Sequence, residues 1–386
     1  MSRKLVLLIL APALLTAADF NGKWDGAVIT PAARVPFRMD VNSGKVCFFE
    51  DTESVCSTSM NVEGDKLTAL WDYMNTRLTL TSSGGALAGT YVNQRTQRVT
   101  QIEATPHKPA PPSASPAANF GGEWEVHSEQ RPGPGEQLIL RQSDSELKGT
   151  ILRVDGDDGT LVGAVSGKQF AISHFSGDRP VLLKGTMEAD GTLQLQLGAQ
   201  KLVAMRPAEA RKRNLTPPLD PMTFAHVRNP QERFHFNLKD VNGKNYTEDT
   251  FAGKPYVVSI TGSWCPNCRD EAPFLAELYQ QYHAKGLQMA AFCFESATDP
   301  TWAPLKAFVR KYNIQYPALL AGEPSAESLH TAVPQIENLS AYPTTIYVGK
   351  DGKVRSVHTG FPSSGSGEEL TRVKEEIRHT IEDMLK

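Results

Sequence analysis

A buried-strand pattern that runs directly into a pair of cysteines constrains the fold of this chain more than any other feature. Residues 256–260 form a continuous apolar run, which is typical of a strand covered on both faces. Residues 271–282 carry apolar side chains at helical spacing. Cys265 and Cys268 lie between these segments. We therefore expect a strand, a tight turn that carries the cysteines, and a helix.

The rest of the C-terminal part alternates between strand and helix patterns. Period-two alternation at 234–240 is followed by Asn242-Gly243, a pair that predicts a hairpin. The other expected elements are a buried strand at 288–294, a helix at 302–312, a hairpin at 344–348 and 353–358, and a charged amphipathic helix at 368–386. This order predicts a central sheet covered by helices.

The predicted position of Cys265 suits it for thiol chemistry. A thiol at a helix N-terminus meets free backbone N–H groups and the positive end of the helix dipole, and both favour the thiolate. The thiolate is the attacking species in disulfide exchange. Cys268 lies three residues further on and is expected to be more shielded. It can attack the mixed disulfide that Cys265 forms and release the partner.

Other uses of two cysteines at this spacing fit less well. A structural zinc site needs four ligands, and the chain has neither a second pair of this kind nor a close pair of histidines. Haem attachment needs His directly after the second cysteine, where this chain has Arg269. A purely structural disulfide would suit a strand-to-helix turn poorly. We expect no metal and no cofactor.

Two segments resemble the TlpA/ResA-like family of thioredoxin-fold proteins. Residues 262–273, Gly-Ser-Trp-Cys-Pro-Asn-Cys-Arg-Asp-Glu-Ala-Pro, resemble the active-site segment of that family. Residues 342–348, Tyr-Pro-Thr-Thr-Ile-Tyr-Val, resemble its cis-proline loop and following strand. The resemblance covers roughly residues 230–386 and does not reach the N-terminal half. It implies a C-terminal α/β thioredoxin-like fold and the activity of a thiol–disulfide oxidoreductase.

The resemblance also implies roles for single residues. Cys265 would be the exposed nucleophile and Cys268 the resolving thiol. Pro343 would follow a cis peptide bond opposite the dithiol, with the carbonyl side of Tyr342 free to pair with an extended substrate segment. Glu271 would be a buried carboxylate that takes up or returns a proton during exchange. Its alternative is an ordinary first-turn acid favoured by the helix dipole.

The neighbours of the dithiol would contribute to substrate binding. Trp264 is expected to pack beside the cysteines and shape the docking surface, with plain core packing as the alternative. Pro266 and Asn267, between the two cysteines, are expected to set the redox potential of the pair. The sequence does not give the value of that potential, because dithiol potentials in this fold range from roughly −270 to −120 mV. The resemblance favours a reductant.

The N-terminal half contains an internal repeat. Residues 18–25, Ala-Asp-Phe-Asn-Gly-Lys-Trp-Asp, are similar to residues 118–125, Ala-Asn-Phe-Gly-Gly-Glu-Trp-Glu. Short alternating runs separated by turn residues follow each copy, which predicts two all-β modules, each a sandwich or small barrel. The expected boundaries are 19–104 for β module 1, 105–118 for a Pro-rich linker, 119–205 for β module 2, 206–227 for a second linker and 228–386 for the thioredoxin-like domain.

The N-terminus predicts export. Residues 1–18 contain a basic start, an apolar run and small residues, the order of a cleaved signal peptide, with an uncleaved anchor as the alternative. No later stretch is long and apolar enough to span a membrane. In a periplasmic or secreted protein, Cys47 and Cys56 are expected to form a structural disulfide, and Cys293 to be an inert core thiol. A formal net charge of −3 gives no indication of nucleic-acid binding.

The function that we expect is exchange between the Cys265–Cys268 pair and protein disulfides or dithiols, with a further protein as upstream electron donor. A thiol peroxidase is one alternative, although the Pro expected just before its nucleophile is absent beside Thr261 and Ser263. A non-enzymatic binding protein that uses its β modules is the other alternative.

Overall fold

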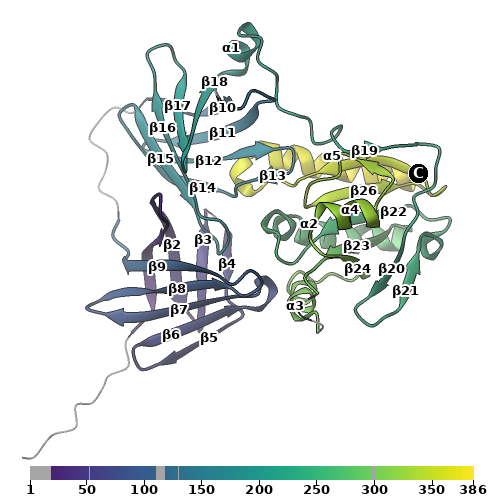
Figure 1. The fold of residues 1–386 in the computed structure, drawn as a ribbon, viewed down its shortest axis with the longest axis horizontal. Coiled ribbons are helices and arrows are strands. Elements are labelled where there is room, and N and C mark those ends of the chain that lie inside the picture. Colours follow the sequence, from purple (N-terminus) through teal and green to yellow (C-terminus); the bar gives the residue numbers. More distant parts are fainter. Residues whose placement is uncertain (1–18, 52, 110–117, 129, 298, 300) are drawn as a thin grey trace, which may run out of the picture.

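The structure is a computed structural model, and it describes residues 19–51, 53–109, 118–128, 130–297, 299 and 301–386. The expected signal peptide lies outside the described residues, as does most of the Pro-rich linker. Two antiparallel sheets, purple to teal in Figure 1, precede a helix-covered sheet in green to yellow. The prediction of a multidomain chain with two β modules and a C-terminal α/β domain is confirmed.

The first module is a single nine-stranded antiparallel sheet. Its strands are β1 (Gly22–Ile29), β2 (Arg34–Asn42), β3 (Lys45–Glu50), β4 (Glu53–Cys56), β5 (Ser59–Glu63), β6 (Lys66–Trp71), β7 (Thr76–Ser83), β8 (Ala86–Asn93) and β9 (Arg98–Pro106). The order β4-β3-β2-β1-β9-β8-β7-β6-β5 ends at β4 and β5, so the described sheet is a half-barrel. Alternating burial along β2 shows the period of two that the sequence predicted.

The second module closes into a barrel. Its strands are β10 (Gly122–His127), β11 (Glu136–Ser143), β12 (Glu146–Arg153), β13 (Gly156–Asp157), β14 (Leu161–Ser166), β15 (Gln169–His174), β16 (Val181–Met187), β17 (Leu193–Leu197) and β18 (Gln200–Met205). Closure follows because β11 pairs with both β10 and β12. Apolar side chains from every side fill the interior.

The internal repeat has the same structure in both modules. Trp24 is buried and its Nε1 donates a hydrogen bond to the carbonyl oxygen of Phe20 at 2.9 Å. Trp124 is also buried and donates to Phe120 at 2.8 Å. Each tryptophan therefore anchors the start of its module by filling the core and satisfying a carbonyl four residues earlier.

The C-terminal domain is built on a seven-stranded mixed sheet of order β21-β20-β24-β23-β22-β26-β27. The strands are β20 (Asn237–Asp240), β21 (Asn245–Thr247), β22 (Tyr256–Thr261), β23 (Gln288–Phe294), β24 (Ala318–Gly322), β26 (Thr344–Val348) and β27 (Val354–Thr359). The helices are α2 (Pro266–Tyr282), α3 (Ala303–Lys311), α4 (Ala326–Ala332) and α5 (Glu368–Leu385). Helices α2, α3 and α5 contribute to one apolar cluster and α4 to the other, which explains why β22 and β23 are buried on both faces.

Several boundaries and elements differ from those that the sequence predicted. β9 extends to Pro106, and the segment 206–227 contains α1 (Pro207–Lys212) and β19 (His226–Val227). β19 pairs with β25 (Ile336–Glu337), away from the central sheet. Within the described part of the chain, no helix has the length and apolar character that crossing a bilayer requires.

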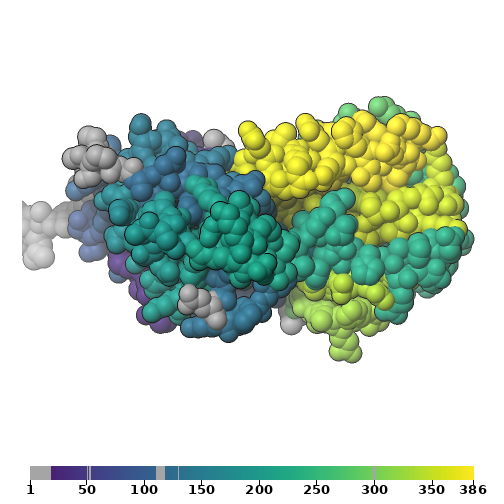
Figure 2. All heavy atoms as spheres, turned by 90° about the horizontal axis from the view of Figure 1, so that it is seen from above, coloured from purple at the N-terminus to yellow at the C-terminus, as the bar shows by residue number. Residues whose placement is uncertain are grey.

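The β modules pack directly against the C-terminal domain. Figure 2 shows them as one lobe in contact with a green and yellow lobe. Tyr73 of module 1 packs edge-on against Tyr312 beyond α3, with ring centroids 6.2 Å apart. Arg141 of module 2 donates to the carbonyl of Ser364 at 3.1 Å. The apolar cluster of module 1 is continuous with that of the α2 face, so the lobes share part of their core.

Candidate active site

Cys265 is the N-cap residue of α2, as the sequence predicted. Its Sγ accepts a hydrogen bond from the backbone N–H of Cys268 at 3.2 Å, and Pro266 occupies the first position of the helix. The two cysteines are joined as a disulfide. The free N–H groups of the first helical turn therefore lie around Sγ of Cys265, where they can stabilise a thiolate once the disulfide opens.

The implied exposure of Cys265 is wrong for this arrangement of the chain. Its side chain is buried, with 3% exposed, and Cys268 is buried as well. The resemblance covers only the C-terminal domain, whereas the β modules contribute the opposite wall of the cleft above the dithiol. Cys265 is therefore buried at a cleft whose walls include both β modules.

The cis-proline loop lies opposite the dithiol. The Tyr342–Pro343 bond is cis, as the resemblance implied. The carbonyl oxygen of Tyr342 lies 3.4 Å from Sγ of Cys265. The ring of Trp264 packs edge-on against that of Tyr342, with centroids 5.1 Å apart, and its Nε1 donates to the carbonyl of Phe294 at 2.8 Å. Trp264 thus connects the dithiol turn to both the cis-proline loop and the end of β23.

Glu271 lies below the dithiol in the second turn of α2 and is fully buried. It accepts hydrogen bonds from Oγ1 of Thr345 at 2.6 Å and from Oγ of Ser259 at 3.0 Å. Burial raises its pKa to about 7, although these two hydrogen bonds act in the opposite direction. This position favours the buried carboxylate over the alternative of a solvated first-turn acid.

A second buried carboxylate, Glu295, fixes the turn that precedes Cys265. It accepts hydrogen bonds from the backbone N–H of Ser263 at 2.6 Å and from its Oγ at 2.8 Å. Burial raises the pKa of Glu295 to about 6. The sequence did not indicate this contact, because nothing in the pattern reveals which distant turn a carboxylate will reach.

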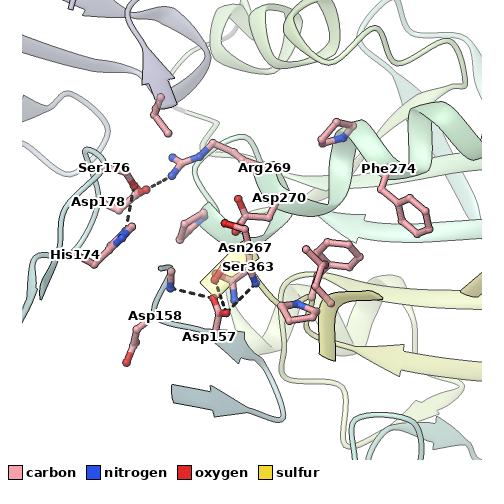
Figure 3. Close-up of a pocket in the computed structure, with 18 of the residues that line it drawn as sticks. Asp157, Asp158, His174, Ser176, Asp178, Asn267, Arg269, Asp270, Phe274 and Ser363 are labelled. Carbon is pink, nitrogen blue, oxygen red and sulfur yellow. Dashed lines mark hydrogen bonds and ion pairs between the residues drawn. The ribbon is translucent and has the colours of Figure 1, made fainter. Parts of the chain in front are cut away.

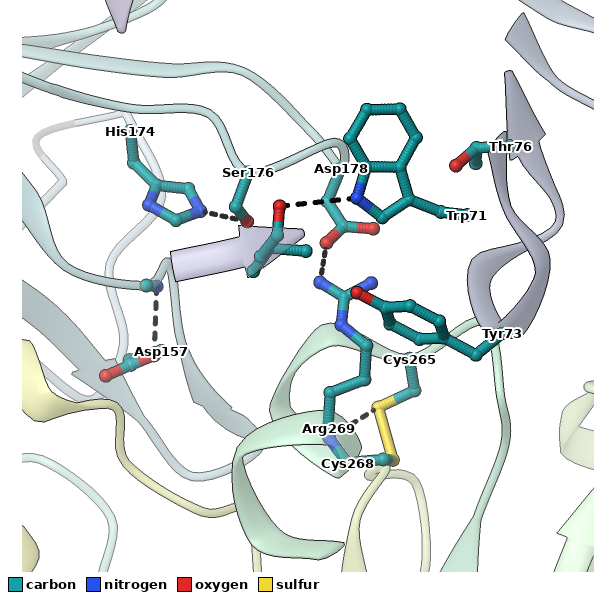
Figure 4. A network of polar contacts seen from close by, with 12 residues as sticks. Trp71, Tyr73, Thr76, Asp157, His174, Ser176, Asp178, Cys265, Cys268 and Arg269 are labelled. Carbon is teal, nitrogen blue, oxygen red and sulfur yellow. Dashed lines mark hydrogen bonds and ion pairs between the residues drawn. A yellow bond between two sulfur atoms is a disulfide. The ribbon is translucent and has the colours of Figure 1, made fainter. Parts of the chain in front are cut away.

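The β modules contact three residues beside the dithiol, and we call these three contacts the clasp. The guanidinium of Arg95 in module 1 lies over the ring of Trp264, 5.1 Å from its centroid. Arg269, directly after Cys268, forms a largely buried ion pair with Asp178 of module 2 (Figure 4). The side-chain amide of Asn267 accepts a hydrogen bond from the backbone N–H of Asp157 in module 2 at 2.8 Å. It donates one to the carbonyl oxygen of the same residue at 3.3 Å.

Gly156 allows the third contact of the clasp. Its φ of +117° is a conformation that L side chains rarely adopt, and a Cβ there would overlap the amide of Asn267. The next residue, Asp157, accepts hydrogen bonds from the backbone N–H and Oγ of Ser363, at 2.8 and 2.7 Å (Figure 3). Burial raises the pKa of Asp157. The β13 segment is therefore bonded both to α2 and to the loop after β27.

Two cavities lie between the lobes, beside the clasp. One has a volume of about 470 Å³ and lies among Asp157, Asp178, Arg269 and the loop after β27 (Figure 3). The other, about 680 Å³, is a cleft at the dithiol that we call the substrate cleft. Its walls come from both β modules, from residues 264–267 and from residues 340–342. Among the described residues, no group of three or more His, Cys, Asp or Glu side chains could hold a metal ion.

The other two predictions for cysteines agree with the structure. Cys47 and Cys56 are directly paired across β3 and β4 and form a disulfide. Cys293 is a free, buried thiol in β23, and burial raises its pKa well above the usual value. Neither lies among the residues that line the substrate cleft.

Comparison with known proteins shows which family the C-terminal part resembles. Residues 228–374 match the Redoxin family profile. The chain is 29% identical over 124 residues to the thiol-disulfide oxidoreductase ResA of Bacillus thuringiensis subsp. konkukian, a match that covers 32% of this chain and 65% of the relative. It is 25% identical over 126 residues to ResA of Bacillus subtilis, covering 33% and 64%. The chain thus spans slightly less than two thirds of these relatives.

Solved structures also match this part. A putative thiol:disulfide interchange protein DsbE from Chlorobium tepidum is 19% identical, with a TM-score of 0.32, and the match covers 40% of this chain and 99% of that one. A putative protein disulfide isomerase from Bacteroides thetaiotaomicron is 19% identical, with a TM-score of 0.32, covering 43% and 94%. Residues 228–374, with their helix-capping cysteine pair and cis-proline loop, are a Redoxin domain similar in sequence to the ResA thiol-disulfide oxidoreductases.

Proposed function

We propose that this protein is an exported thiol–disulfide oxidoreductase that reduces protein disulfides through Cys265 and Cys268. The observation that carries the proposal is the position of Cys265 as N-cap of α2, bonded to Cys268 and facing the carbonyl of Tyr342 across the substrate cleft. Similarity to ResA over the same residues supports the reaction class.

In the first step, the thiolate of Cys265 attacks one sulfur of a substrate disulfide. A mixed disulfide forms, the substrate S–S bond breaks, and one substrate sulfur leaves as thiolate and takes a proton. The N–H groups at the start of α2 stabilise the anion before attack. Trp264 and the Tyr342–Pro343 loop border the substrate on either side of the sulfur.

In the second step, Cys268 attacks Sγ of Cys265 and releases the second substrate thiol. The two electrons that reduce the substrate come from the two cysteines, which end as the disulfide. Cys268 must lose its proton first, and Glu271 lies one helical turn beyond it with a pKa of about 7. A carboxylate with that pKa can accept a proton near neutral pH and return it when the disulfide is reduced again.

The direction and compartment complete the proposal. An upstream dithiol protein re-reduces the Cys265–Cys268 disulfide, and export places both partners outside the cytoplasm. Equilibration of the full chain with glutathione buffers tests the direction, since a reductant should have a potential below about −180 mV, the value of protein disulfide isomerase. A potential near −120 mV would make the protein an oxidant instead.

A trapping experiment tests the cysteine roles. The Cys268→Ser protein, expressed in its host, should accumulate mixed disulfides on Cys265, because the second attack is missing. Cys265→Ser is the matched control and should trap nothing. Recovery of partners on Cys268 rather than Cys265 would reverse the assignment. Failure of both variants to trap any thiol protein, with no disulfide reduction by the wild type, would reject the proposed function.

A further inference from the structure

The clasp occupies the surface through which an isolated Redoxin domain could meet a protein partner. Trp264, Asn267 and Arg269 surround the two cysteines, and each is bonded to a β module. Asp178 and Arg269 are mostly buried, with 17% and 5% of their side chains exposed. A folded protein cannot contact Asn267 or Arg269, which are both buried, unless the lobes separate.

We propose that the β modules select the substrate, admitting an extended polypeptide segment and excluding folded protein surfaces. This inference rests on the proposed function and names the substrate class for the same site. It assigns to the two modules a direct part in the reaction, as walls of the substrate cleft, rather than the role of a spacer.

The size of the substrate cleft supports a single extended segment. Its volume of about 680 Å³ lies within the roughly 300–1,000 Å³ of typical ligand pockets. Recognition of a folded protein face usually buries about 800 Å² on each partner, which needs a broad open surface. The cleft is also bordered by backbone at residues 340–342 and by the turn between β1 and β2. The carbonyl oxygen of Tyr342, 3.4 Å from Sγ of Cys265, can accept a main-chain hydrogen bond from an extended chain.

The charges of the cleft lining are balanced. Arg153, which lines it, is paired with Glu136 at 3.1 Å and with Asp158 at 3.0 Å. Asp157 is occupied by its hydrogen bonds to Ser363. A further set of charged lining residues has no carboxylate or cationic partner among the described residues. It consists of Arg131, Asp155, Arg179 and Lys184. Counted together with Arg153, Glu136, Asp157 and Asp158, the lining carries four cations and four carboxylates, so its summed charge favours neither sign on an incoming chain.

The test uses one leaving group on three carriers. A thionitrobenzoate mixed disulfide is placed on an unstructured peptide with acidic flanks, on the same peptide with basic flanks, and on a surface cysteine of a stable folded protein. Reduced full-length protein attacks each carrier, and release of the coloured thiolate gives the rate. The acidic peptide should react at least about tenfold faster than the folded carrier, a factor equivalent to ~1.4 kcal/mol. The basic peptide should also react faster than the folded carrier, because the charges of the cleft lining are balanced.

Opening the clasp should reduce this selectivity. Arg95→Ala/Asp178→Ala removes two of its contacts, and Gly156→Ala disrupts the third sterically without changing any charge. In both variants the rate ratio between acidic peptide and folded carrier should fall to less than about threefold, and the ratio cancels any change in the reactivity of Cys265 itself. Asp65→Ala/Lys66→Ala, at the end of the β5–β6 turn and the start of β6, changes residues that do not line the cleft. It is the matched control and should retain the wild-type ratio.

Two outcomes would overturn the inference. One is a wild-type protein that attacks the folded carrier as fast as the acidic peptide; the other is clasp variants whose ratio equals that of the wild type. Alkylation of reduced Cys265 by iodoacetamide, located by mass spectrometry, separates this failure from failure of the proposed function. If Cys265 is alkylated but releases no thiolate from any carrier, the oxidoreductase function fails.

Discussion

Replacing Glu271 by Gln should make the protein more stable at pH 8 and slower in thiol exchange. Glu271 is fully buried, and its carboxylate accepts hydrogen bonds from the hydroxyl groups of Ser259 and Thr345. Burial raises its pKa from 4.5 to about 7. Gln has nearly the same shape and keeps a carbonyl acceptor, so the substitution removes the charge while largely preserving the packing.

The sign and size of the stability effect follow from the two pKa values. Between pH 4.5 and 7 the folded state keeps the proton of Glu271 while the unfolded chain has lost it, so stability falls as pH rises. The loss is complete above the folded pKa. Each pH unit corresponds to ~1.36 kcal/mol, so the ionised carboxylate costs about 3 kcal/mol at pH 8. Gln does not ionise and avoids this cost.

The assay compares urea unfolding of the oxidised wild type and Glu271→Gln at pH 4.5 and pH 8. The variant should gain about 3 kcal/mol over the wild type at pH 8 and almost nothing at pH 4.5. Glu277→Gln, on the exposed side of the same helix, is the control and should show no such pH dependence. An equal difference at the two pH values would refute the reasoning. Exchange activity of Glu271→Gln at pH 7 should fall by about 10²-fold, because the proton acceptor for Cys268 is lost.

Three further predictions concern the supports of the fold and site. Cys47→Ser/Cys56→Ser should lower the free energy of unfolding of module 1 by ~2–3 kcal/mol in calorimetry while the exchange rate stays unchanged; a lowered rate would mean a second redox pair. Trp24→Phe and Trp124→Phe should each destabilise their own module by ~1 kcal/mol, because each loses one equivalent buried hydrogen bond, and strongly unequal losses in denaturant unfolding would contradict the structural repeat. Glu295→Ala should slow exchange at least about tenfold through a looser turn before Cys265. A normal rate at pH 7 would exclude this positioning role.

Much of the C-terminal domain could be predicted because local signals there agree with the tertiary structure. The apolar runs in β22 and β23 predict strands that are buried on both faces, and the helical spacing in α2 predicts a helix with one buried face. The elements β24, α4 and β25 were not predicted. α4 and β25, with seven and two residues, are too short to show a period, whereas β26, as short as β24, lies in the segment 342–348 that resembles the cis-proline loop and its following strand. In module 2 the alternation predicted strands, but only the pairing of β11 with β12 decided that they close into a barrel.

In the candidate active site, too, some features follow from local sequence and others only from tertiary contacts. Cysteine spacing and the strand-to-helix turn determined by themselves that Cys265 caps a helix beside Cys268, because the two residues are local neighbours. Tertiary structure alone decided that Glu295 reaches Ser263 and that Arg95 and Asp178 reach the dithiol turn. These contacts join segments far apart in the chain, and periodicity reports only whether a residue faces a core. The cleft that the β modules form around the buried Cys265 has no signature along the sequence for the same reason.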